Sequence, residues 1–225
     1  MDVGLVRSRI AAAAARAGRP TESVRIVAVT KGHPLERARE AAAAGLLDLG
    51  ENRVQEALAK QDAWPAAPVR WHLIGHLQRN KARLAVGRFA LIHSLDSIRL
   101  AEALEAVAAA AGSVQDVLIE VNVAREPQKS GATPEEAPAL VGRVAELPHL
   151  GVRGLMAMAP YGAAPRVQHE VFGGLRELRD RLSRDPELAT LTELSMGMSD
   201  DFEAAVEEGA TMVRLGTVLF GERAS

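Results

Sequence analysis

Short apolar segments alternate with helical patterns along the whole sequence, and this alternation restricts the possible folds more than any other feature. The apolar segments predict strands at residues 24–31, 46–50, 69–75, 89–93, 117–123, 150–158, 193–196 and 212–215. Strands that alternate with helices are typical of βα units around a parallel sheet. Eight such units predict an α/β fold, a single (β/α)8 barrel of the TIM type. A doubly wound open sheet is the alternative interpretation.

One barrel domain accounts for the length of the chain. The sequence has 225 residues, and no linker, internal repeat or low-complexity segment divides it, so we expect one domain over residues 1–225. The sequence predicts an extra, amphipathic N-terminal helix that ends at Gly18. Its apolar residues occur at helical spacing: Val3, Val6, Ile10 and Ala13. The apolar run in this helix is too short and too rich in alanine for a signal peptide.

The composition excludes several classes of partner and chemistry. A net charge of −2 and a pI near 6.3 provide no electrostatic attraction to nucleic acid or to an anionic membrane. No apolar run approaches the length that spans a bilayer. The absence of cysteine excludes disulfides, thiolate metal sites and cysteine nucleophiles. These features predict a cytoplasmic protein.

Lys31 stands at the end of the first predicted strand. The loops at the carboxyl ends of barrel strands form active sites, so this position makes Lys31 a candidate functional residue. A lysine in a partly dry pocket has a lowered pKa and forms Schiff bases with carbonyl compounds. A lysine at a strand end also commonly extends its ammonium group into solvent. Lys31 by itself does not decide between these two interpretations.

A second candidate lies near the C-terminus, where two segments have the features of an anion site. Ser199 is expected to cap a helix that closes at Gly209, and Gly197 would allow a ligand close to the backbone. Arg214 ends the last predicted strand, and a turn with free amides follows at residues 216–217. In barrels, the loops after strands seven and eight frequently bind phosphate. The alternative is an ordinary helix cap followed by ordinary turn glycines.

Several other residues are expected to have structural roles. His72 and His76 are four residues apart, as metal ligands on a helix would be, but they fall in a strand that runs into Gly75. We therefore predict no metal site. Lys129 follows the fifth strand and is expected to be solvated, with an anion or aldehyde contact as the alternative. Met156 and Met158 lie on one face of a predicted strand and are expected in the barrel core.

Ordered motifs over essentially the whole chain resemble one known family. They are Val-Thr-Lys-x-x-Pro (29–34), Gly-Glu-Asn-Arg-Val-Gln-Glu (50–56), Trp-His-Leu-Ile-Gly-His-Leu-Gln-Arg-Asn-Lys (71–81), Lys-Ser-Gly (129–131), Ser-Met-Gly-Met-Ser-x-Asp (195–201), Val-Arg-Leu-Gly-Thr (213–217) and Phe-Gly (220–221). The chain resembles the pyridoxal phosphate homeostasis proteins, a family similar to the N-terminal barrel domain of alanine racemase. The resemblance implies a barrel of fold type III among pyridoxal phosphate (PLP) proteins.

The resemblance also implies a role for individual residues. Lys31 would carry PLP as a Schiff base, and Asn52 would line the ring or the lysine side. Arg214 would face the pyridine nitrogen, as the matching arginine does in the racemase. The phosphate would be held by the Ser199 hydroxyl and by the backbone amides of Gly216 and Thr217.

The implied function is to bind PLP and maintain its intracellular supply, without catalysis. Arginine keeps its proton in proteins, so Arg214 would favour an unprotonated pyridine nitrogen and a weaker electron sink. Racemisation also needs a second acid or base, and the single tyrosine, Tyr161, lies in a loop. We predict no catalytic residues. A PLP-dependent amino-acid racemase or lyase of fold type III is the alternative, and a PLP-free barrel enzyme for a phosphorylated metabolite is a third hypothesis.

The expected partners follow from this function. They are PLP itself and apo forms of PLP-dependent enzymes that would receive it, with no nucleic acid and no membrane. The dimer contacts of the racemase come largely from its second domain, for which we expect no counterpart here. We therefore expect a monomer.

Overall fold

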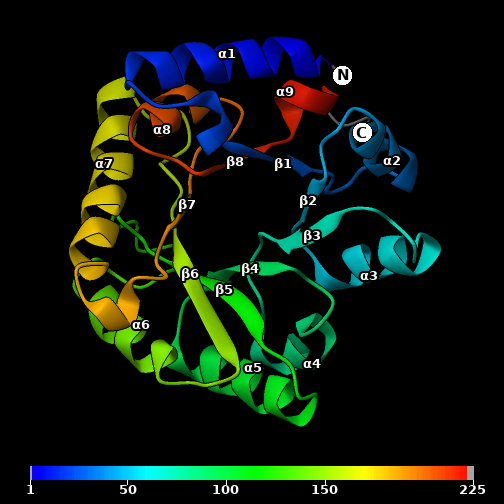
Figure 1. The fold of residues 1–225 in the computed structure, drawn as a ribbon, viewed down its shortest axis with the longest axis vertical. Coiled ribbons are helices and arrows are strands. Elements are labelled where there is room, and N and C mark those ends of the chain that lie inside the picture. Colours follow the sequence, from blue (N-terminus) through cyan, green and yellow to red (C-terminus); the bar gives the residue numbers. More distant parts are fainter. Residues whose placement is uncertain (1, 222–225) are drawn as a thin grey trace.

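Eight parallel strands form a closed barrel in the computed structural model, which describes residues 2–221 (Figure 1). The strands are β1 (Arg25–Val29), β2 (Asp48–Glu51), β3 (Arg70–Leu73), β4 (Leu91–Leu95), β5 (Gln115–Glu120), β6 (Leu150–Met156), β7 (Glu193–Ser195) and β8 (Met212–Leu215). Each strand pairs with its neighbours in the chain, and β1 also pairs with β8. The predicted (β/α)8 barrel is confirmed, and the open sheet is wrong because it would leave β1 and β8 unpaired.

A helix follows each strand and covers the outside of the barrel (Figure 1). These helices are α2 (Leu35–Ala43), α3 (Val54–Ala63), α4 (Ala82–Ala85), α5 (Ile98–Ala110), α6 (Ala137–Ala145), α7 (Pro165–Leu182), α8 (Phe202–Glu207) and α9 (Thr217–Phe220). The short α4 is preceded by a turn of 3-10 helix at Arg79–Lys81. The helices leave the carboxyl ends of the strands open at one end of the barrel, where the connecting loops lie.

The additional helix α1 (Val3–Arg16) lies against α8 and α9 (Figure 1). Its buried face consists of Val6, Ile10, Ala13 and Ala14. Two ion pairs join its polar side to α8, from Arg9 to Glu203 at 3.0 Å and from Arg16 to Glu207 at 2.5 Å. The predicted amphipathic helix is confirmed within the described residues, and it stops two residues before Gly18, which has a positive φ of 64°.

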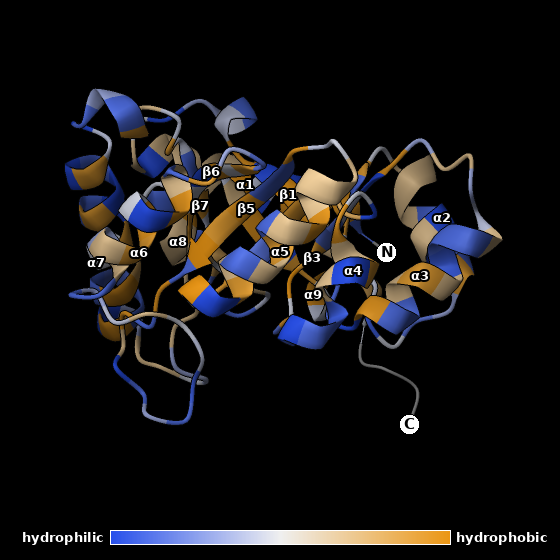
Figure 2. Cartoon of the chain, turned by 90° about the horizontal axis from the view of Figure 1, so that it is seen from below, coloured by the Kyte–Doolittle hydropathy of each residue, from blue (hydrophilic) through white to orange (hydrophobic). Residues whose placement is uncertain are grey.

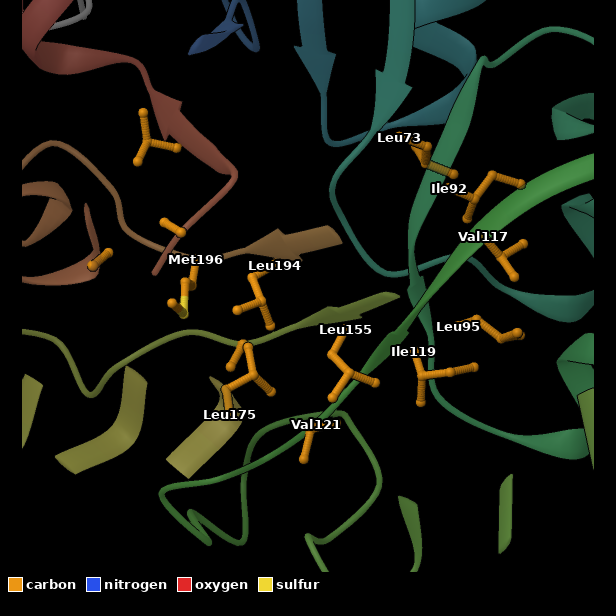
Figure 3. Packing of buried hydrophobic residues seen from close by; sticks show 14 of the residues in the cluster. Leu73, Ile92, Leu95, Val117, Ile119, Val121, Leu155, Leu175, Leu194 and Met196 are labelled. Atoms are coloured by element: carbon orange, nitrogen blue, oxygen red, sulfur yellow. The ribbon is translucent and has the colours of Figure 1, made fainter. Parts of the chain in front are cut away.

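Apolar side chains form two layers, one inside the barrel and one between the barrel and its helices. The inner layer is small and consists of Val27, Leu91, Leu118, Met156 and Met212, with Met158 packed against it. The two methionines therefore lie in the barrel core, as predicted. The outer layer is larger, and Figure 3 shows Leu155 and Leu194 of the strands beside Leu175 of α7. In Figure 2, α7 alternates between orange and blue because only one face meets this layer.

Near the carboxyl ends of two strands, the structure differs from what the local sequence predicts. The pattern after the second apolar segment predicts a helix that begins at residues 51–53, but Glu51 is the last residue of β2 and α3 begins at Val54. Ser94 and Asp96 are the capping residues that the sequence predicts for α5, whereas Ser97 holds the N-cap position without a side-chain capping bond. In both cases the strand and its loop continue further than apolar periodicity indicates, because polar side chains at these strand ends have partners inside the fold.

The described helices also bear on membrane association. Among residues 2–221, none combines the length and the apolar character that a bilayer crossing requires.

Candidate functional site

The carboxyl ends of four adjacent strands bring the predicted site residues to one end of the barrel. Lys31 follows β1, Asn52 follows β2, and Ser199 follows β7. Arg214 lies within β8, and Gly216 and Thr217 come directly after it. Because β1 pairs with both β2 and β8, these segments are neighbours around the barrel. Lys31 and Thr217 are almost two hundred residues apart in the sequence, and the strand order of the closed barrel brings them together.

Lys31 is half-buried at the mouth of the barrel. Side chains alternate along a strand, and Val27 of β1 points into the inner core. Thr30 points the other way, because its hydroxyl bonds to Glu51 in the layer outside the barrel. Lys31 continues the alternation of Val27 and Val29, so its side chain starts from the inner side of the barrel. This position agrees with a lysine that serves a pocket at the strand ends.

Buried polar groups fix the turn that carries Lys31. The carbonyl oxygen of Thr30 accepts a hydrogen bond from Lys60 Nζ at 2.7 Å. The amide of Gly32 donates to Glu56 Oε1 at 2.5 Å. The backbone on either side of Lys31 is therefore tied to α3, which reduces the conformational freedom of the lysine before any ligand binds.

Glu51 and Lys60 form the buried part of this support. Glu51 is fully buried, and its Oε1 accepts from Lys60 Nζ at 2.6 Å and from the Thr30 hydroxyl at 2.5 Å. Burial raises the pKa of the Glu51 carboxyl, while the bonds from Lys60 and Thr30 oppose that rise. Sequence reasoning missed both residues. The available signal was a polar residue at a buried strand end with a lysine nine positions later on the following helix.

The loop after β7 forms one side of the proposed phosphate region, with a different cap from the one expected. Asp201, not Ser199, occupies the N-cap position of α8. Asp201 Oδ1 accepts from the amide of Met198 at 2.5 Å, and burial raises the pKa of this carboxyl. Ser199 Oγ accepts from the amide of Val218 at 3.2 Å, which joins the β7 loop to α9. The hydroxyl hydrogen of Ser199 can therefore be donated to a ligand.

The turn after β8 forms the other side. Gly216 is the N-cap of α9 and Thr217 is its first residue, so amides here lack acceptors within the helix. A Cβ built on Gly216 would lie 3.6 Å from Val29 Cβ, which places this turn directly beside the end of β1. The turn that carries Lys31 and the amides of α9 are consequently adjacent.

Gly197 is expected to be sensitive to substitution because α8 approaches its backbone. Gly197 has a φ of 89°, and an added Cβ would lie 2.6 Å from Ala205 Cβ and 2.9 Å from Phe202 Cα. We expect Gly197→Ala to lower the free energy of unfolding by about 3 kcal/mol, through backbone strain and overpacking together. Urea denaturation would measure it. Gly162→Ala is the matched control, since Gly162 has a φ of 67° but nothing within 4 Å; equal losses in both variants would refute the packing argument.

Arg214 is buried in β8, two residues before Gly216, and faces the barrel interior. It pairs in register with Val27, an inner-core residue, and is 4% exposed. Its NH1 donates to Ser195 Oγ at 2.6 Å and its NH2 to the carbonyl of Ala157 at 3.0 Å. Burial lowers the pKa of Arg214 to about 10, although the charges of Asp201 and Glu120 oppose the shift. Arg214 thus remains a cation at neutral pH.

Glu120 is a further polar residue at this end of the barrel that sequence reasoning missed. It ends β5, is buried, and accepts a hydrogen bond from the Ser130 hydroxyl at 3.0 Å. Burial raises the pKa of Glu120, and the nearby charge of Asp96 adds to this while Arg214 opposes it. A glutamate at the end of an apolar strand was the only sequence signal.

The structure places the remaining candidates as follows. Asn52 is partly exposed, and its backbone lies so close to Gly75 that a Cβ there would be 2.4 Å from the Asn52 carbonyl oxygen. Tyr161 is 93% exposed. Lys129 is not simply solvated, since its Nζ donates to the Ala159 carbonyl at 3.2 Å and pairs with Glu126. The prediction of a solvated Lys129 is therefore wrong, because the loop folds back over its side chain.

The two histidines of the Trp-His-Leu-Ile-Gly-His motif have different surroundings. His72 is buried and bonded to Asp48 and His93, whereas His76 is half-exposed and pairs with Asp96 at 3.3 Å. Within the described part of the chain, no group of three or more histidine and carboxylate side chains is arranged to hold a metal ion.

The sequence and the fold both match known proteins. Residues 1–224 match the alanine racemase N-terminal domain family. The pyridoxal phosphate homeostasis protein of Aquifex aeolicus is 48% identical over 218 residues, which are 97% of this chain and 95% of that protein. The protein of the same name from Pseudomonas aeruginosa is 46% identical over 222 residues, covering 99% of this chain and 94% of that protein.

Solved structures agree. PipY of Synechococcus elongatus, solved with PLP bound, is 41% identical and superimposes with a TM-score of 0.84 over 96% of this chain and 100% of that one. An alanine racemase from Clostridium difficile, 15% identical, shares the fold with a TM-score of 0.77 over 97% of this chain and 56% of its own. Similarity of this extent, in sequence and in structure, shows that the chain belongs to the pyridoxal phosphate homeostasis proteins of the alanine racemase N-terminal domain family.

Proposed function

We propose that this chain binds PLP at the carboxyl ends of β7, β8, β1 and β2 and maintains its intracellular supply. The observation that carries the proposal is the adjacency of the Lys31 turn and the amides after β8. A lysine amine and a phosphate-binding region side by side suit an aldehyde that bears a phosphate. The relative PipY, 41% identical over nearly the whole chain, was solved with PLP bound, which supports the same ligand here.

Each residue has a stated task in this proposal. Lys31 Nζ forms a Schiff base with the aldehyde of PLP. The Ser199 hydroxyl and the amides of Gly216 and Thr217 hold the phosphate. Asn52 lines the ring or the lysine side, and the Arg214 guanidinium faces the pyridine nitrogen. PLP, when bound to an enzyme, supplies an electron sink for carbanion chemistry.

The residues around the ring support holding PLP rather than catalysis. Arg214 donates hydrogen bonds and does not accept them, so a pyridine nitrogen beside it stays unprotonated and attracts electrons less. Tyr161, the tyrosine considered above for a second acid or base, is 93% exposed. The names of the relatives, pyridoxal phosphate homeostasis proteins, support the same role. We therefore propose a monomeric cytoplasmic protein that buffers PLP and delivers it to apo-enzymes.

The phosphate contacts predict a selective effect of a serine substitution. Ser199→Ala removes one hydroxyl donor to a charged group, which is worth about 1.5 kcal/mol, or about tenfold in affinity. We expect PLP to bind about tenfold more weakly while pyridoxal, which has no phosphate, binds as before. Titration of the visible Schiff-base absorbance with each aldehyde measures both affinities. A similar loss for pyridoxal would show that Ser199 does not contact the phosphate.

The delivery step needs its own experiment. Loaded protein is mixed with an apo form of a PLP-dependent enzyme, in the presence of a phosphatase that destroys free PLP. Activation of the enzyme under these conditions supports direct transfer. Activation that disappears with the phosphatase supports buffering of free PLP instead.

One observation favours the alternative of a racemase or lyase. Glu120, whose pKa is raised by burial, is an acid at the same end of the barrel. The test is incubation of PLP-loaded protein with L-alanine in deuterated water. Exchange of the α-hydrogen, lost in Glu120→Gln, would establish catalysis, and absence of exchange supports the binding role. A protein that takes up no PLP would instead favour the third hypothesis, a PLP-free enzyme for a phosphorylated metabolite.

A further inference from the structure

A continuous chain of hydrogen bonds crosses the barrel interior from Arg214 to the opposite end. Arg214 NH1 lies 2.6 Å from Ser195 Oγ, which lies 2.8 Å from His93 Nδ1. His93 Nε2 is 2.9 Å from His72 Nδ1, and His72 Nε2 is 2.9 Å from Asp48 Oδ1. All five residues are buried. The chain links strands β8, β7, β4, β3 and β2 across the inside of the barrel.

The two ends determine the direction of every bond in this chain. The Arg214 guanidinium has only donors, so Ser195 Oγ accepts from it. Ser195 then donates to His93 Nδ1, His93 Nε2–H donates to His72 Nδ1, and His72 Nε2–H donates to Asp48. This assignment satisfies all the bonds with two neutral imidazoles. With His72 as a cation the two middle bonds would reverse, and the buried hydroxyl hydrogen of Ser195 would have no acceptor in the chain.

The charges along the chain agree with this direction. Burial lowers the pKa of His93 far below its usual value, and the positive charges of Arg214 and Arg25 add to the shift, so His93 is neutral. Burial alone would raise the pKa of Asp48, but hydrogen bonds from His72 and Arg70 hold it well below its usual range. Asp48 is therefore an ionised acceptor at neutral pH.

Asp48 also connects the chain to the surface. Arg70 donates to both oxygens of Asp48, at 2.7 Å each, and its side chain is 56% exposed. Asp48 and Arg70 line a hollow of about 550 Å³ between the start of α1 and the first strands. This hollow is at the amino ends of the strands, remote from Lys31.

We propose that Asp48 is a positioning residue for the cofactor site: it fixes the tautomers of His72 and His93, so that Ser195 donates to His93 and its oxygen accepts from Arg214 alone. The Arg214 guanidinium is then held by Ser195 and Ala157 with its remaining N–H groups available to the pyridine ring nitrogen. The part of this proposal that concerns the ring rests on the proposed PLP-binding function. The part that concerns the tautomers does not.

Asp48→Leu tests the proposal because it keeps the approximate size of the side chain and removes the acceptor of His72. Asp48 Oδ1 accepts from both His72 and Arg70, so an amide at this position could still accept from His72, whereas leucine cannot. A buried N–H group without an acceptor is strongly disfavoured, so we expect the chain to reverse, with the hydrogen on Nδ1 of both histidines, and Ser195 to receive two donors. Arg70→Met is the matched control, since it removes the same ion pair but leaves Asp48 as the acceptor.

The first measurement is the tautomer of each histidine by 15N NMR of the free protein. We expect hydrogen on Nε2 of His72 and His93 in the wild type and in Arg70→Met, and on Nδ1 in Asp48→Leu. Wild-type histidines with hydrogen on Nδ1, or tautomers that Asp48→Leu leaves unchanged, would overturn the proposal. This measurement needs no PLP, so its outcome is separate from that of the proposed function.

The second measurement compares two aldehydes, pyridoxal and salicylaldehyde, which lacks the ring nitrogen. Titration of Schiff-base absorbance should show about tenfold weaker binding of pyridoxal to Asp48→Leu and unchanged binding of salicylaldehyde. Ser195→Ala should reproduce this difference with unaltered histidine tautomers, and it keeps the test available if Asp48→Leu does not fold. Equal losses for both aldehydes would show a general structural effect and refute the positioning role. Failure of the wild type to bind PLP itself would refute the proposed function instead.

Discussion

Replacing Lys31 by alanine is expected to abolish the visible Schiff-base absorbance of the protein mixed with PLP. The sequence contains four lysines, Lys31, Lys60, Lys81 and Lys129, and Lys31 is the one beside the amides after β8. Any binding that remains would be non-covalent, weaker on the order of 100-fold, or about 3 kcal/mol. The free energy of unfolding should change by less than about 0.5 kcal/mol, because Lys31 is half-exposed.

Borohydride reduction followed by peptide mass mapping measures the same prediction directly. The reduced adduct should map to the peptide that contains Lys31 in the wild type and be absent from Lys31→Ala. Lys81→Ala is the control, since Lys81 lies in the 3-10 turn after β3 and its Nζ contacts Gln55 Oε1 at 3.5 Å; it should keep both the absorbance and the adduct. An adduct on Lys129 in the wild type would contradict the assignment of Lys31.

Replacing Lys60 by methionine is expected to have the largest effect on stability. The substitution leaves the Glu51 carboxylate buried without a cation, and breaking a buried ion pair from one side costs about 3–5 kcal/mol. The turn of Lys31 also loses the bond from Lys60 Nζ to the Thr30 carbonyl. We therefore expect a lower urea midpoint and a slower reaction of Lys31 with PLP.

The pH dependence of this variant identifies the cause. Burial already raises the pKa of Glu51 above its unfolded value, and removing Lys60 raises it further. A raised carboxyl pKa means that ionisation opposes folding, so the deficit of Lys60→Met should shrink as the pH falls from 8 towards 5. Adding Glu51→Gln should restore most of the stability at pH 8, since the amide is neutral. A deficit independent of pH, and not relieved by Glu51→Gln, would attribute the loss to packing alone.

Most of the fold could be predicted from the sequence because its signal is local. A strand buried on both faces is mostly apolar, so β1, β5 and β8 stand out as short, largely apolar runs between helical patterns. Strand order then follows from chain order in a closed barrel, which brings Lys31, Ser199 and Thr217 to the same end. The element ends were less predictable. Glu51 belongs to β2 because its carboxylate bonds to Lys60, and Asp201 occupies the N-cap position of α8, where its carboxylate accepts from the Met198 amide in the preceding loop.

The sequence by itself therefore determined the barrel, the position of Lys31 at a strand end, and the segments beside it. These could be predicted because apolar periodicity and short motifs each span only a few neighbouring residues. Only the tertiary structure decided which buried polar groups meet. Asp48 and Ser195 are 147 residues apart in the chain, and each is unremarkable in its own segment. They are linked through His72 and His93 because the barrel encloses a small interior in which every buried polar group must find a partner from another strand.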